Sequence, residues 1–149
     1  ETPEDVIEHF EHTRSLQDEA ISNGLEGFTA FIPWSYKRGD TPLAKRVAVE
    51  AGPNPYLRMI AMSRIYLDNI KHIQASWFSE GKKTGEVALN FGGDDFGGTL
   101  FDENVMQEAG FYNRTSVEQV HQMIREAGFT PAQRTTKYEI LNVFDQHGT

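Results

Sequence analysis

The chain alternates between stretches whose apolar residues recur with helical spacing and short, continuous apolar runs. In the first stretch Val6, Ile7 and Phe10 lie three or four positions apart, which favours a helix with one buried side. The same spacing recurs further along, with Ser79 as the cap of one helix and a capping box beginning at Thr115 for another. The pattern predicts helices at about 3–23, 55–69, 80–91, 102–109 and 116–127.

Short apolar runs rich in aromatic and β-branched residues separate these helices. They predict strands at 27–36, at 72–78 and at about 94–100. Pro33 indicates that ladder pairing stops within the first strand, because proline has no N–H to donate. The tail from 129 to 144 is mixed and predicts an extended segment followed by a helical turn.

The order of these elements predicts an α/β fold with about three parallel strands, because a helix separates each strand from the next. Three strands are few for a complete sheet, and an eight-stranded (β/α) barrel takes about 250 residues. The order therefore favours the C-terminal half of a TIM-type barrel, as one partial barrel domain over 1–149. A small open α/β sheet is the alternative.

Composition narrows the class of protein. A formal charge of −8 argues against a nucleic-acid partner or an anionic membrane surface, since both need clustered Lys and Arg. No apolar run approaches the roughly 18 residues that a membrane span needs. Without cysteine the chain has no disulfides, and we expect a cytoplasmic protein. The sequence begins at a helix cap and not at Met, which suggests a fragment.

Polar residues follow the predicted strands at their carboxyl ends, where parallel α/β folds bind ligands. In the third strand Asp95 and Thr99 share one face, opposite Phe96, which we expect to pack under the helices. Gln74 and Ser76 likewise share a face, opposite the apolar residues of the second strand. A buried face of this kind is costly unless a ligand or an internal network satisfies its polar groups.

The stretch "NFGGDDFGGTLFDENV" at 90–105 contains two adjacent carboxylates. Neighbouring strand residues point to opposite faces, so Asp94 and Asp95 cannot easily share a metal ion. We expect Asp95 to face a ligand and Asp94 to be structural, with Gly97 leaving room for close approach. An aspartate beside Gly-Gly is also a common turn residue, and this alternative stays open.

Other candidates are weaker. Glu103 and Asn104 begin the predicted short helix after the third strand, where they suit a sugar hydroxyl or a capping role. His72 and His121 are isolated and predict surface or loop positions. Trp34 could stack on a ligand or pack at the rim, and Trp77 favours packing because of its parity.

Three longer blocks, "FIPWSYKRGDTPLAKR", "IQASWFSEGKKTG" and "DDFGGTLFDENV", resemble the C-terminal half of radical S-adenosylmethionine enzymes of the cyclic dehypoxanthine futalosine synthase family. The resemblance covers nearly the whole chain. Aminofutalosine synthases and the second subunit of the deazaflavin FO synthases share the layout and are the alternatives. A self-standing small α/β module that binds a sugar-like ligand is a third possibility.

The resemblance implies a barrel enzyme of menaquinone biosynthesis that uses S-adenosylmethionine, a [4Fe-4S] cluster and an external electron donor. The three cysteines that hold the cluster in this family are absent from this chain, so we expect the fragment alone to be inactive. No catalytic residue is assigned.

The resemblance and the strand parity together predict two groups of ligand contacts. The residues expected near the adenosine of the cofactor are Ile32, Pro33 and Trp34. Those expected to contact a small nucleoside-like substrate are Ser35, Gln74, Ser76, Asp95, Thr99, Glu103 and Asn104. Arg134 could clamp a benzoate group, but the tail should emerge at the barrel floor, which favours a structural role.

Overall fold

The computed structural model describes residues 1–40, 42–47, 49–99 and 114–145. The helix predicted at 102–109, with Glu103 and Asn104, lies outside these residues. The helices are α1 (Pro3–Ser22), α2 (Pro53–Tyr66), α3 (Trp77–Glu80), α4 (Lys82–Leu89) and α6 (Val117–Glu126), with a 3-10 turn at Pro42–Lys45. The strands are β1 (Ala30–Phe31), β2 (His72–Ile73), β3 (Ala132–Arg134) and β4 (Ile140–Val143).

The three predicted strands run parallel, as expected. Strand β1 pairs with β2 in parallel register, with Ala30 opposite His72 and Phe31 opposite Ile73. The third segment joins through a parallel bridge between Gln74 and Asp95. The fold is thus mixed α/β with βα order, although the ladders are shorter than predicted.

The strand predicted at 72–78 is too long. The chain turns into α3 at Trp77, and Gly81, at φ 87°, separates α3 from α4. Ser79 therefore lies within a helical turn and is not a cap. The last helix is also capped one residue later than predicted, since Ser116 and not Thr115 accepts the hydrogen bond from the Gln119 N–H.

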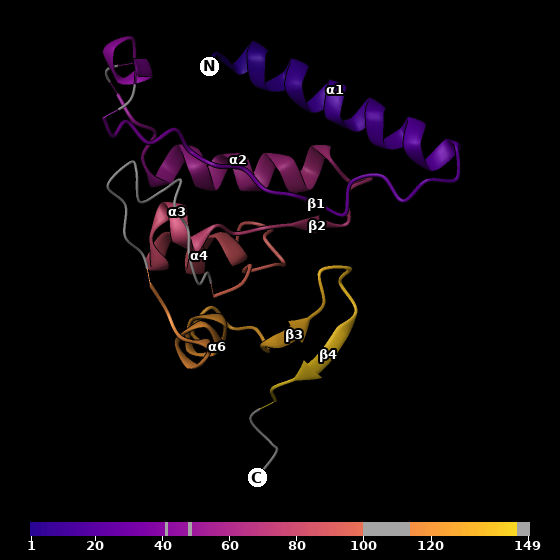
Figure 1. Ribbon diagram of the computed structural model, residues 1–149, viewed down its shortest axis with the longest axis vertical. Coiled ribbons are helices and arrows are strands. Elements are labelled where there is room, and N and C mark those ends of the chain that lie inside the picture. The colour runs from indigo at the N-terminus through magenta and orange to yellow at the C-terminus, as the bar shows by residue number, and fades with distance from the viewer. Residues whose placement is uncertain (41, 48, 100–113, 146–149) are drawn as a thin grey trace.

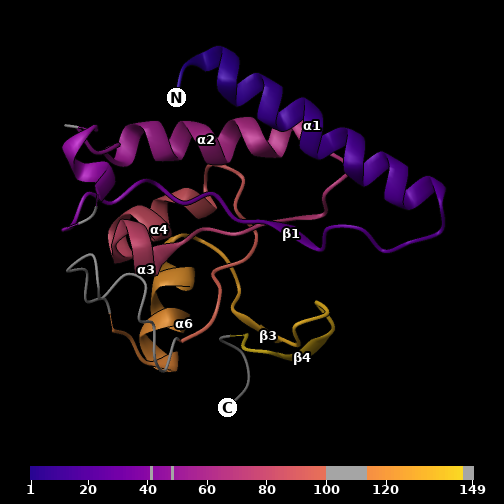
Figure 2. The same ribbon diagram turned by 45° about the horizontal axis from the view of Figure 1, so that its top comes forward.

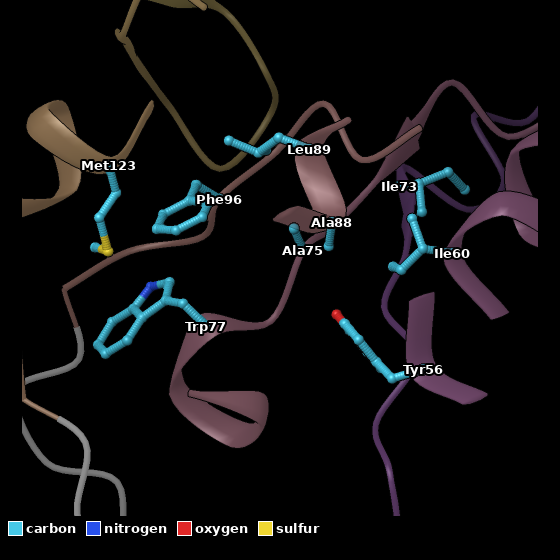
Figure 3. Packing of buried hydrophobic residues seen from close by; sticks show 9 residues of the cluster. All are labelled: Tyr56, Ile60, Ile73, Ala75, Trp77, Ala88, Leu89, Phe96 and Met123. Atoms are coloured by element: carbon cyan, nitrogen blue, oxygen red, sulfur yellow. The ribbon is translucent and has the colours of Figure 1, made fainter. Parts of the chain in front are cut away.

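In Figure 1 helices α2, α4 and α6 follow one another down the molecule, and the main core joins them to the parallel segments (Figure 3). Phe96 and Trp77 are buried in this core, which confirms the packing predicted for both. Figure 3 shows Met123 of α6 beside them, with Ile60 of α2 and Ile73 of β2 at the opposite end. The apolar faces of the parallel segments therefore pack against the helices, as the alternation of their residues predicts.

Helix α1 adds a second, smaller core and lies across α2 (Figure 2). Thr2 caps it, as the start of the sequence indicates, and also forms a reciprocal capping box with Asp5. Phe10 packs on Leu67 and Ile70, and its ring stacks on Tyr66 at a centroid distance of 5.7 Å. In the described ranges no helix has both the length and the apolar content that crossing a bilayer requires.

The tail forms an antiparallel hairpin of β3 and β4, and the helical turn predicted there is wrong. The register is irregular between Gln133 and Arg134, and the connecting turn holds Tyr138 at φ 64°. A left-handed backbone is uncommon for a residue with a bulky side chain and marks a position fixed by its surroundings. In Figure 1 the hairpin lies beside α6, on the side of the molecule away from α1 and α2.

Candidate functional site

Asp95 is the centre of a buried polar network that joins the third parallel segment to the hairpin. Its Oδ1 accepts from Arg134 Nε at 3.0 Å and from the Gly97 N–H at 3.2 Å. Its Oδ2 accepts from Arg134 Nη2 at 2.6 Å, from Gln74 Nε2 at 2.8 Å and from the Tyr138 hydroxyl at 2.8 Å. A carboxylate offers about four lone-pair sites, so the chain itself fills the acceptor capacity of Asp95.

The network also sets the charge of Asp95. Burial raises the pKa of this carboxyl, but the hydrogen bonds from Arg134, Gln74 and Tyr138, with the charge of Arg134, outweigh burial and hold the pKa below its usual value. Burial, together with the hydrogen bond to Asp95, raises the pKa of Tyr138. Asp95 is therefore an ionised acceptor and Tyr138 a neutral donor at physiological pH.

Gln74 is held on two sides. Its Nε2 donates to Asp95, and the backbone of Gly97 lies against its amide, where a Cβ on Gly97 would stand 3.3 Å from Cδ. Gly97 has φ 73°, which favours glycine in any case. The room that the sequence assigned to an approaching ligand is thus taken by Gln74. Of the two ways predicted to satisfy this polar face, the internal network is the one observed for Asp95.

The Tyr138 ring is sandwiched between two side chains. It stacks on the His72 ring at a centroid distance of 3.7 Å and an interplanar angle of 6°. Arg134 makes a cation–π contact with the same ring, with its Cζ 3.9 Å from the ring centroid. His72 Nδ1 lies 2.6 Å from Asp94 Oδ2. The prediction that His72 is an isolated surface or loop residue is therefore wrong. His121 is not isolated either, since its ring lies 4.2 Å from that of Phe144.

Asp94 has the structural role predicted for it. Its Oδ1 accepts from the Ile73 N–H at 2.8 Å and from Arg64 Nη2, so it ties α2 to the start of β2. Arg64 Nε also donates to the Gly92 carbonyl at 2.7 Å, which anchors the turn that precedes the acid pair. The two adjacent aspartates point to different partners, as strand geometry requires.

A second polar cluster lies after the carboxyl ends of β1 and β2. Lys37 Nζ pairs with Glu80 Oε2 at 3.1 Å, and both side chains are nearly buried. Glu80 Oε1 accepts from the Ser35 N–H at 3.3 Å and from Ser79 Oγ at 3.2 Å. This carboxylate therefore fixes the segment after β1 on α3, and with it the residues predicted to meet the cofactor.

Those predicted residues differ in their surroundings. Pro33 is buried, whereas Ile32 and Trp34 are exposed. The Trp34 ring meets Phe78 edge-on at 5.2 Å, so Trp34 packs at the rim and keeps an open face. A ligand contact of these residues stays a prediction.

Ser76 is fully buried, and its Oγ has no hydrogen-bond partner in the described part of the chain. Its N–H donates to the Tyr56 hydroxyl at 2.7 Å, and burial raises the pKa of Tyr56 to about 12. A buried hydroxyl without a partner is costly. Ser76 is thus a predicted substrate residue whose buried hydroxyl has no partner among the described residues.

Thr99 stands apart from Gln74 and Ser76. It is exposed and lines a cavity of about 840 Å³ between the third parallel segment, α6 and the hairpin. Apolar side chains such as Val120 and Ile124 of α6 line this cavity together with Asp95, Arg134 and Tyr138 of the polar network. The structure thus joins Gln74 directly to Asp95, whereas Thr99 shares with Asp95 a cavity that neither Gln74 nor Ser76 lines.

Sequence reasoning missed three members of these clusters. Tyr138 gave no signal, because its role depends on the turn that brings it onto His72. Lys37 and Glu80 follow the first two parallel segments closely, and their opposite charges at neighbouring strand ends were a usable signal. Arg134 has the structural role favoured for it, with Asp95 as its partner.

The chain's own side chains do not fit an iron–sulfur cluster. It has no cysteine, and within the described ranges no group of three or more His, Asp or Glu side chains could hold a metal ion. Any cluster ligands must therefore come from outside this chain.

The fold defines an α/β chain of parallel βα units, a class of fold that binds ligands at the carboxyl ends of its strands. Residues 25–147 match the family model described as the CofH/MqnC C-terminal region. The chain belongs to this family.

Curated relatives agree with this assignment. The chain is 42% identical over 144 residues to cyclic dehypoxanthine futalosine synthase of Streptomyces coelicolor, covering 97% of this chain and 35% of the relative. It is 41% identical to the protein of that name from Halalkalibacterium halodurans, covering 92% and 35%. It is also 36% identical to the 5-amino-6-(D-ribitylamino)uracil–L-tyrosine 4-hydroxyphenyl transferase of Methanopyrus kandleri, covering 97% and 39%. The chain spans a little over a third of the length of these relatives.

Proposed function

We propose that the chain is the C-terminal part of a radical S-adenosylmethionine enzyme that converts dehypoxanthine futalosine to cyclic dehypoxanthine futalosine. The observation that carries the proposal is the 42% identity to a cyclic dehypoxanthine futalosine synthase over 97% of this chain. The parallel βα order fits the second half of a (β/α) barrel, in which ligands lie at the carboxyl ends of the strands.

The proposal assigns the cofactor and the cluster to different parts of the full-length enzyme. The cluster, held outside this chain, would supply the electron that generates a carbon radical from S-adenosylmethionine, with an external donor to reduce it. Ile32, Pro33 and Trp34 follow β1 and would line the adenosine side, on the segment that Glu80 fixes. This chain by itself has no activity under the proposal, and it works in the cytoplasm without a nucleic-acid or membrane partner.

The substrate would meet the inner face of the parallel segments. Ser76 supports this assignment, because its buried hydroxyl has no partner among the described residues. Ser35, Gln74, Asp95 and Thr99 are the further proposed contacts in the described part of the chain, and Glu103 and Asn104 complete the set. A reactive carbon radical makes exclusion of competing groups and positioning the main tasks of these side chains.

A second candidate reaction has its own support. The 36% identity to a 5-amino-6-(D-ribitylamino)uracil–L-tyrosine 4-hydroxyphenyl transferase also covers 97% of this chain. Both named reactions concern a ribose- or ribityl-bearing molecule, so the inner polar face fits either. We rank the cyclisation first because the identity to the cyclising enzymes is higher.

The test compares the two reactions in the full-length enzyme that contains this chain, with S-adenosylmethionine and a reductant. We expect cyclic product from dehypoxanthine futalosine, and no coupling of 5-amino-6-(D-ribitylamino)uracil to tyrosine. A variant without its cluster-binding cysteines is the control and should form neither product. Turnover of the uracil substrate with none of the futalosine derivative would reverse the order of the two candidates.

A further inference from the structure

We infer that Gln74 meets the substrate through its amide oxygen, and that Asp95, Arg134 and Tyr138 are positioning residues that fix the direction of this amide. The inference rests on the proposed function and refines it. It replaces the direct substrate contact predicted for Asp95 by an indirect one.

The direction of the Gln74 amide follows from its partner. An amide has a donor end and an acceptor end, whereas an ionised carboxylate only accepts. Because Gln74 Nε2 donates to Asp95 Oδ2 at 2.8 Å, the donor end is committed. The acceptor end, Oε1, receives no hydrogen bond from the described residues. Gln74 therefore presents an oxygen acceptor to whatever lies on the inner face.

Asp95 in turn cannot rotate to follow a ligand. Arg134 holds both of its oxygens, the Tyr138 hydroxyl adds a third donor, and Gly97 N–H a fourth. Arg134 is itself fixed, since its Nη1 donates to the Thr135 carbonyl at 2.9 Å and its Cζ lies over the Tyr138 ring. The hairpin thus sets the position of Asp95, and Asp95 sets that of Gln74.

The backbone of Gly97 also restricts the Gln74 amide. Gly97 lies against the flat face of the Gln74 amide, with three amide atoms within 3.4 Å of where a Cβ would stand. The amide can neither flip, because its donor end would lose Asp95, nor swing towards the third segment. Such preorganisation spares the enzyme the cost of ordering this group when substrate binds.

An amide oxygen selects its ligand by chemistry. It accepts from a hydroxyl or an amine and repels a carboxylate or a phosphate. On the proposed substrate the matching groups are the ribose hydroxyls. A site built to bond a hydroxyl discriminates strongly against an analogue that lacks it, since the acceptor, once covered by the bound ligand, is then left unpaired.

The test uses the full-length enzyme and substrate analogues that lack one ribose hydroxyl. Wild type should prefer the natural substrate over one of these analogues by at least about tenfold in kcat/KM, and Gln74→Met should lose most of that preference. Arg134→Lys should weaken the preference in the wild-type background and leave it unchanged in the Gln74→Met background. Lys137→Ala, an exposed change in the same hairpin turn, is the matched control and should have no effect.

The outcomes separate the two proposals. The inference would be overturned if Gln74→Met retained the preference, or if Arg134→Lys had an equal effect in both backgrounds. An active wild type would still uphold the proposed function in either case. A merely structural Arg134 would lower stability without changing the preference. A wild-type enzyme that does not convert the substrate would overturn the proposed function and this inference together.

Discussion

Arg134 holds the carboxylate of Asp95 with two nitrogens, Nε to Oδ1 at 3.0 Å and Nη2 to Oδ2 at 2.6 Å, across 39 residues of sequence. The pair binds the C-terminal hairpin to the inner face of the third parallel segment. Asp95 is buried and Arg134 mostly so, which makes the contact a partly desolvated, bidentate ion pair. The Lys37–Glu80 pair has a similar role in the second polar cluster, where it holds the segment after β1.

Replacing Arg134 by Ala should destabilise the protein strongly. The change leaves Asp95 buried without its opposite charge, and breaking a buried pair from one side costs about 3 kcal/mol or more. Urea unfolding of the full-length enzyme measures the free energy of unfolding. Arg58→Ala removes an exposed arginine of α2 without a charged partner in the described structure and should change it little. Equal effects of the two variants would contradict the buried ion pair.

The contribution of Asp95 to stability should disappear in acid. Burial raises its pKa, but hydrogen bonds from Arg134, Gln74 and Tyr138 outweigh burial, so the folded-state pKa lies below the unfolded value of about 4. Stabilisation by a carboxyl of lowered pKa is complete above the unfolded value and is lost as the pH falls through the folded one.

The measurement for this prediction is the difference in the free energy of unfolding between wild type and Asp95→Asn. We expect it to be constant between about pH 7 and 5 and to shrink below about pH 4, because the Asn variant has no proton to bind at this site. A difference that remains unchanged at about pH 3 would show that the pKa of Asp95 is not lowered on folding.

Gly97→Ala should destabilise the protein by about 1–2 kcal/mol. Its φ of 73° disfavours any side chain, and a Cβ would stand 3.3 Å from the Gln74 amide. Gly98→Ala is a close control, because a Cβ there meets no atom within 4 Å. We expect that variant to lie within about 0.5 kcal/mol of wild type. Thermal unfolding checks both, and a larger loss in Gly98→Ala would refute the argument from backbone conformation.

Glu80→Gln should loosen the segment that follows β1. The change removes the charge that pairs with buried Lys37 and weakens the acceptor of the Ser35 N–H, so we expect a loss of about 3 kcal/mol. Amide hydrogen exchange should become faster at Ser35 while the amides of α6 keep their rates. Lys83→Met removes an exposed lysine from an ion pair on α4; it is the control and should leave exchange at Ser35 unchanged. Unaltered exchange in Glu80→Gln would mean that other contacts fix this segment.

The local and periodic features of this chain were open to prediction. Helix α1 with its Thr2 cap, the parallel order, the packing of Phe96 and the inner placement of Asp95 all follow from spacing and alternation, which act over a few residues. The strand lengths did not follow, since Trp77 reads as the end of a strand but begins a helical turn. No local rule distinguishes the two for a short apolar run.

The sequence by itself determined which face of each parallel segment is polar and that Asp94 and Asp95 have different roles, because neighbouring strand residues cannot share a side. Only the tertiary structure decided the partners. Arg134 and Tyr138 reach Asp95 through a hairpin whose turn holds Tyr138 at positive φ, and this geometry depends on contacts with His72 made 66 residues away in the chain (138 − 72). Satisfying a buried charge is a property of the assembled fold, so the donors that surround Asp95 could be named only once the hairpin was seen in place.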